Sequence, residues 1–68
     1  MEGWTQIYST TSSALANMKK HLLEEKGISV VVLNQQDSLY NNFGDIKIYV
    51  KPENAIKAIR IIEEDDDE

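Results

Sequence analysis

The sequence predicts an α+β fold, a two-layer sandwich in which two helices cover one face of a three-stranded sheet. Three observations lead to this prediction. Short runs of β-branched and aromatic residues alternate with two amphipathic segments in the order β-α-β-β-α. The amphipathic segments are bounded by residues typical of helix starts and stops. At 68 residues, the chain has room for one domain.

Residues 4–8 (WTQIY) predict the first strand, because aromatic and β-branched residues dominate the segment. The Ser/Thr cluster of residues 9–13 predicts a helix start, with Ser12 or Ser13 as the N-cap. Gly27 is placed to end this helix in a left-handed cap. The apolar positions of the helix fall on one broad stripe that we expect to face the sheet: Leu15, Met18, Leu22 and Leu23.

Two further strands follow. Residues 28–33 (ISVVVL) form a nearly continuous β-branched run, which is typical of a strand sheltered on both faces. Residues 45–51 (DIKIYVK) alternate instead, and predict a half-buried strand with Ile46, Ile48 and Val50 facing inward. The polar stretch of residues 34–44 between them predicts an ordered loop.

Pro52 predicts the first turn of the second helix, where its missing N–H costs nothing. An Ala/Ile stripe then packs on the sheet until about Glu63: Ala55, Ala58, Ile59 and Ile62. Residues 64–68 are expected to form a disordered acidic tail, because like charges repel and nothing there can be buried. Residues 1–63 then make up the single folded domain.

The order of these elements predicts the topology. A strand, a crossover helix and a parallel strand form a right-handed unit, and a gap left in it for the third strand gives the split arrangement of ferredoxin-like folds. The sheet order is then 2-3-1, with both helices on one face. Because the second strand lies at an edge in this order, the helices shelter only one of its faces. Either Ile28, Val30 and Val32 or Ser29, Val31 and Leu33 must then meet water or a partner.

Composition narrows the classes of function. The net charge of −5 opposes both nucleic acid backbones and anionic membrane surfaces, so neither is an expected partner. No apolar run approaches the roughly 18 residues that a membrane-spanning helix needs, and the expected location is the cytoplasm. The chain has no cysteine, which excludes disulfides and thiolate zinc sites. With so small a core, stability comes from packing or from self-association.

The sequence offers no catalytic or ligand-binding motif. His21 is the single histidine and is predicted on the polar flank of the first helix, which is a poor position for a catalytic triad or a metal site. The three glycines form no phosphate-binding pattern. Trp4, Tyr8 and Tyr49 suggest an RNA-stacking platform, but the basic motif of such binders is missing. We therefore predict a protein that is not an enzyme and holds no cofactor or metal.

Several segments together resemble a known family: WTQIYST, LLEEKGISVVVLN, QQDSLY and IKIYVKPENAIKAI. The chain resembles the small bacterial proteins grouped as putative prokaryotic signal transducing proteins, over about residues 4–62. Residues 33–40 and 46–50 with Gly44 look like the version found in Bacteroides-type bacteria. The family is similar in fold to nitrogen-regulatory PII proteins. In PII-like proteins, the loop between strands two and three carries nucleotide and partner contacts, and residues 34–44 occupy that position here.

These observations favour a regulatory or protein-interaction module that binds another protein, or a second copy of itself. The alternative is a small-ligand sensor that uses the loop as its receptor. The candidate loop residues in either case are Asn34, Gln36, Asp37, Ser38 and Tyr40. Asp37 and Ser38 also suit a purely structural role, because both residue types close turns through their own backbone contacts.

The candidate interface is the open face of the second and third strands, with Val31, Leu33 and Tyr49, and Tyr8 and Trp4 are further candidates for it. The second strand lacks charge, proline or any visible bulge, and such edges invite pairing, which favours a homodimer. The competing interpretation is that the loop folds back and covers this face with its own apolar residues: Leu39, Tyr40 and Phe43.

Overall fold

The computed structural model describes residues 2–35 and 44–66. Its elements follow the predicted order β-α-β-β-α. They are strand β1 (Thr5–Thr10), helix α1 (Ser13–Glu25), strand β2 (Val30–Asn34), strand β3 (Ile46–Val50), the 3-10 turn η1 (Pro52–Asn54) and helix α2 (Ala55–Asp66). Neither helix of this described part of the chain has the length and the apolar character needed to cross a lipid bilayer.

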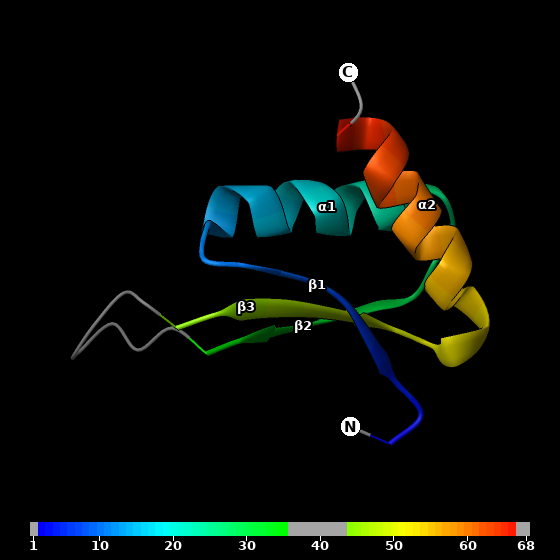
Figure 1. The fold of residues 1–68 in the computed structure, drawn as a ribbon, viewed down its shortest axis with the longest axis horizontal. Helices are drawn as coiled ribbons and strands as arrows, with labels where there is room; N and C mark the ends of the chain where they lie inside the picture. Colours follow the sequence, from blue (N-terminus) through cyan, green and yellow to red (C-terminus); the bar gives the residue numbers. More distant parts are fainter. Residues whose placement is uncertain (1, 36–43, 67–68) are drawn as a thin grey trace.

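The three strands form one sheet in the order β1-β3-β2, which is the predicted 2-3-1 arrangement. Both outer strands pair antiparallel with β3, so β1 and β2 run parallel to each other on either side of it. Both helices lie on the same side of the sheet (Figure 1). The prediction of a ferredoxin-like two-layer fold is therefore confirmed. One face of the sheet is covered by helices, and the described residues leave the other face open.

The ends of α1 explain where the helix begins and stops. Ser12 is extended, and its hydroxyl accepts a hydrogen bond from the backbone N–H of Leu15 at 3.2 Å. At the other end, Gly27 has a φ of +82°, a conformation that glycine adopts without steric cost. The N–H of Ile28 donates to the carbonyl of Leu23 at 3.1 Å, which is the Schellman pattern. Both predicted caps are confirmed.

The core lies between the helices and the covered face of the sheet. Ile46, Ile48 and Val50 are buried there, as the alternation of β3 predicts. The main core cluster joins Ile48 and Val50 to both helices and comprises six buried side chains: Leu23, Ile28, Ile48, Val50, Ala58 and Ile62. Burying such side chains stabilises the fold by about 1.5 to 3 kcal/mol each before entropy is counted. This cluster is therefore the main source of stability.

The predicted inward stripe of α1 is confirmed at Leu23 and wrong at Leu15 and Met18. Leu15 is 42% exposed and Met18 is 58% exposed, whereas the buried residues of α1 are Ala16, Lys19 and Leu23. One residue corresponds to a rotation of about 100° on a helix, so a shift of this size replaces most of the inward face. In α2, Ile59 is likewise 40% exposed, and Ala58 and Ile62 take the core positions.

Strand β1 contains a β-bulge that was not predicted from its sequence. Gln6 pairs with Tyr49 and Tyr8 pairs with Ile48, so Ile7 is an extra residue without a partner on β3. As a result, Ile7 and Tyr8 both pack against the core. The suggestion that Tyr8 lies on the open face with Tyr49 is therefore wrong.

Helix α2 is longer than predicted. It continues to Asp66, so residues 64–66 are helical and the expected acidic tail begins inside a helix. The carboxylate of Asp65 lies 3.1 Å from the ammonium group of Lys19, and this ion pair offsets part of the charge repulsion at the helix end. Residues 67 and 68 lie outside the described residues, so a disordered tail stays a prediction for them alone.

Candidate functional site

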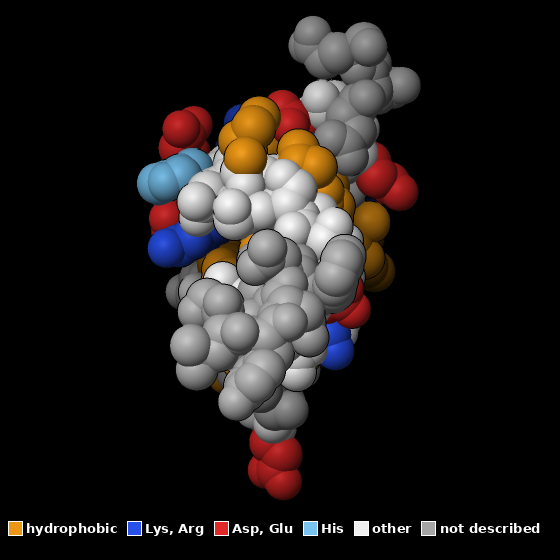
Figure 2. Space-filling view, turned by 90° about the vertical axis from the view of Figure 1, so that its left-hand side faces the viewer, with side chains coloured by type: hydrophobic (Ala, Val, Ile, Leu, Met, Phe, Trp, Pro, Cys, Tyr) orange, Lys and Arg blue, Asp and Glu red, His pale blue; other side chains and the backbone are white. Residues whose placement is uncertain are grey.

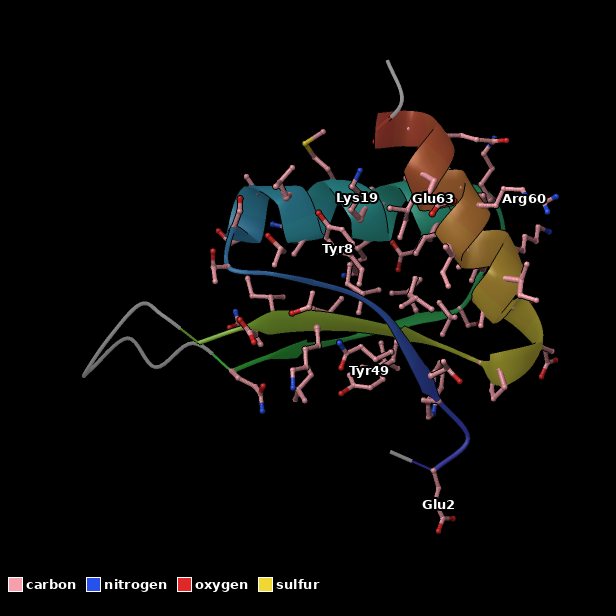
Figure 3. The ribbon with its side chains drawn as sticks, in the orientation of Figure 1. Glu2, Tyr8, Lys19, Tyr49, Arg60 and Glu63 are labelled. Carbon is pink, nitrogen blue, oxygen red and sulfur yellow. The ribbon has the colours of Figure 1, made fainter. Side chains whose placement is uncertain are left out.

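The structure brings the predicted interface residues together on the open face. Val31 on β2 lies directly opposite Tyr49 on β3, and Leu33 lies opposite Lys47 in the same way. Tyr49 points away from the helices, whereas Tyr8 points toward them (Figure 3). Leu33 is 39% exposed, and Val31 and Tyr49 are half-buried. The predicted set thus forms one contiguous patch, which we call the apolar patch: Val31, Leu33 and Tyr49.

Where β1 pairs with β3, its side chains on the open face are polar. Gln6 on β1 lies opposite Tyr49, and Ser9 lies opposite Lys47, and both β1 residues are exposed. Cross-strand neighbours on one face have side chains close enough to interact. The open face therefore changes from polar side chains on β1 to apolar side chains on β2. The apolar patch therefore borders the outer edge of β2.

Among the described residues, no strand pairs with the outer edge of β2. The N–H of Gln35 donates to the carbonyl of Asp45 at 2.9 Å, so Gln35 directs its backbone toward β3. In an antiparallel pair this direction alternates along the strand, and Val31 and Leu33 therefore also point toward β3. Val30 and Val32 point the other way, with their N–H and C=O groups directed out of the sheet. This edge has the chemistry to accept another strand.

The two edges of the sheet are not equivalent. Strand β1 carries the bulge at Ile7, a device that discourages pairing at sheet edges. Strand β2 pairs with β3 without interruption from Val30 to Asn34, and it contains no charge and no proline. Of the two edges, β2 is the one suited to strand addition.

Most of the predicted loop site cannot be placed. Asn34 is the last residue of β2 and is exposed. Gln36, Asp37, Ser38 and Tyr40 lie outside the described residues. The apolar loop residues Leu39 and Phe43 lie outside them as well, so the two interpretations, a receptor loop and a loop that covers the sheet, both stay predictions.

Lys19 is a feature that the sequence analysis missed. Its side chain is 2% exposed in the helix layer, and its ammonium group makes an ion pair with Asp65 at 3.1 Å. The same group lies 5.9 Å from the centroid of the Tyr8 ring, within range of a cation–π interaction. The ion pair connects the end of α2 to the middle of α1. The spacing of Ala16, Lys19 and Leu23 is the only local signal, because it repeats the pattern of an inward stripe.

A shallow, open groove lies on the outer side of the helix layer. It has a volume of about 310 Å³ and is lined by Met18, His21, Leu22, Glu25 and Asp65. Figure 2 shows hydrophobic side chains at the top of the view, on the helix layer, with the pale blue histidine beside them. His21 is exposed at this groove, on the polar flank where it was predicted. Within residues 2–35 and 44–66, no group of three or more His, Cys, Asp or Glu side chains is arranged to hold a metal ion.

Comparisons with known proteins identify the family. A family model with the description "Putative prokaryotic signal transducing protein" matches residues 4–66. This match spans almost the whole chain, so the protein belongs to that family. No curated protein and no solved structure matches the chain.

Proposed function

We propose that this member of the signal transducing family is a regulatory module that is not an enzyme and acts by binding protein through β2. The observation that carries the proposal is that β2 combines outward-directed backbone groups with apolar side chains on the open face. Val30 and Val32 direct backbone groups outward that no strand within the described residues pairs, and Val31 and Leu33 place apolar side chains on the adjoining open face. Backbone groups of this kind provide affinity for an added strand, and the alternate side chains provide specificity.

The helix-covered side of the molecule supports the same proposal. The ionisable side chain buried there, Lys19, is already engaged with Asp65 across the two helices, and this contact serves packing. A catalytic site needs a nucleophile and a base within hydrogen-bonding distance of each other, whereas Lys19 and Asp65 form an ion pair between two helices. Binding is the activity for which the exposed surface has suitable chemistry.

The proposal is tested by capturing partners from a lysate of the native host with wild-type protein and with a Leu33→Glu variant. Glutamate at this position faces Lys47 on β3, so the variant should keep its fold while placing a charge in the apolar patch. The matched control is Ile56→Glu, which changes a residue of α2 that is already 76% exposed.

Proteins retained by the wild type and by Ile56→Glu but lost with Leu33→Glu support the proposal. The same set of proteins bound by all three forms contradicts it. A metabolite that co-purifies and raises the melting temperature equally in all three forms would instead favour the ligand sensor.

A further inference from the structure

We infer that the occupant of the β2 edge is a second copy of this chain, paired antiparallel about a two-fold axis at Val32. This inference rests on the proposed function, because it names the partner of the same surface. It follows from the register of β2, from the distribution of charge along the chain and from the difference between the two sheet edges.

The register makes β2 self-complementary. Val32 directs its backbone outward and is the middle residue of the strand Val30–Asn34. If two copies meet there, Val32 of one copy and Val32 of the other exchange two N–H···O=C hydrogen bonds. The axis then places Val31 of each copy opposite Leu33 of the other, on the open face. Each such pair is apolar against apolar, so one strand sequence satisfies both sides of the interface.

Charge favours this axis over other positions. Each copy carries a net charge of −5, which opposes association in general. Residues 28–36 nevertheless contain no charged residue, so no like charges meet across an axis at Val32. The residues that flank the strand, Ser29 and Gln35, would lie opposite each other and are both polar and uncharged. The paired segment is therefore neutral in an otherwise acidic protein.

The interface extends the sheet from three strands to six. The apolar patches of the two copies would then be continuous across the axis, and Tyr49 of each copy would lie next to the Val31–Leu33 pair. Strand β1 remains at both outer ends, where its bulge limits further addition. Growth therefore stops at a closed dimer, as two-fold symmetry requires. Because only a short strand from each copy is paired, we expect a dissociation constant in the micromolar range.

The test uses the absence of cysteine from the wild-type chain. Val31→Cys and Leu33→Cys variants are each prepared with a distinguishable mass tag, mixed at tens of micromolar and oxidised. The proposed axis places these two positions in a non-hydrogen-bonded pair with Cα atoms about 4.5 Å apart, which suits a disulfide. The expected product is a disulfide between the two different variants, formed at least tenfold more than the disulfide within either variant alone.

Sedimentation equilibrium of the unmodified chain complements the cross-linking. We expect a dimer for the wild type and for Ile56→Glu, and a monomer for Leu33→Glu. A monomeric wild type, or disulfides that form equally between like and unlike variants, would overturn the inference. Such a result leaves the proposed function intact if Leu33→Glu still loses a captured protein, because another protein would then occupy the edge.

Discussion

Neighbouring residues of β3 have opposite environments. Ile48 is fully buried against the helices, whereas Tyr49, the next residue, is half-buried on the open face. The facing of the residues alternates on β2 as well, because Val32 lies opposite Ile48 and Val31 lies opposite Tyr49, but Val32 at the sheet edge is 36% exposed. The covered face holds the fold together, and the open face contributes surface that no described helix covers. In a domain this small, the two tasks are divided between the two sides of one three-stranded sheet.

The comparison predicts a large difference between truncations on the two faces. Replacing Ile48 with alanine removes a fully buried side chain from the central strand and should lower the free energy of unfolding by about 2 to 5 kcal/mol. A domain of this size has a total stability of about 3 to 5 kcal/mol, so the variant is expected to be partly unfolded at 25 °C. Urea unfolding followed by circular dichroism measures the loss.

Two variants keep this test interpretable. Ile48→Val removes one methyl group and should cost about 0.5 to 1.5 kcal/mol, which leaves a measurable folded state. Tyr49→Ala changes the open face and should cost clearly less than Ile48→Ala. Equal losses at residues 48 and 49 would show that the two faces do not differ as described.

The second prediction concerns the helix that covers the sheet. Leu23 is fully buried, and its replacement by alanine should cost about 2 to 4 kcal/mol. Met18 is 58% exposed, so the same truncation there should cost less than about 1 kcal/mol. Thermal unfolding of the two variants compares the positions directly. A larger loss for Met18→Ala would restore the helix orientation that the sequence suggested.

The orientation of α1 on the sheet could not be predicted from hydrophobic periodicity alone. The set Leu15, Met18 and Leu22 and the set Ala16, Lys19 and Leu23 both follow the spacing i, i+3, i+7, one residue apart. The first set is more apolar, and hydrophobic periodicity therefore favoured it together with Leu23, which is the fully buried member of the predicted stripe. The helix instead directs alanine and the stem of a lysine toward the sheet, because Lys19 finds a carboxylate on α2 for its charged end. That partner is 46 residues away in the sequence, so no local pattern could reveal it.

The sheet was more predictable than the helices. Alternation in residues 46–50 identifies the inward residues of β3 without ambiguity, and the order of elements restricts the topology to few choices. Period and order left two sets of β2 residues for the face of Tyr49, one with Val30 and Val32 and one with Val31 and Leu33, and the structure places Val31 and Leu33 there. The bulge of β1 has no signal in TQIYST, since the segment contains neither glycine nor proline. The loop part of the candidate site, residues 36–43, is not described and stays a prediction.

The third prediction tests the one ion pair that the described residues bury on the covered side. Asp65→Ala removes the carboxylate that lies 3.1 Å from the buried ammonium group of Lys19. Removing one partner of a buried charge is destabilising, and we expect a loss of about 1 to 3 kcal/mol. The lower end applies if water reaches the site, because the side chain of Asp65 is itself 42% exposed. Chemical denaturation at low ionic strength gives the value.

A double-mutant cycle separates this ion pair from general effects on the helix end. Lys19→Met keeps a long side chain in the core without a charge, and it should be close to neutral in stability. In that background, Asp65→Ala should cost much less than it does in the wild type. The same cost in both backgrounds would mean that Asp65 acts through the end of α2 and not through Lys19.

The smallest change in intrinsic stability is expected on the open face, and there the association of two copies becomes visible. Leu33 is already 39% exposed and lies opposite Lys47, so Leu33→Glu should change the stability of the monomer by no more than about 0.5 kcal/mol. A dimer that forms only between folded chains is stabilised by mass action, and its melting temperature rises with protein concentration.

The wild type should therefore melt at a higher temperature at hundreds of micromolar than at a few micromolar, whereas Leu33→Glu should melt at one temperature throughout. Ile56→Glu, the control on α2, should behave like the wild type. If the melting temperature of the wild type does not depend on concentration, the open face adds nothing to stability through self-association. The covered face would then stabilise the fold, and the open face would be available to a partner other than a second copy of the chain.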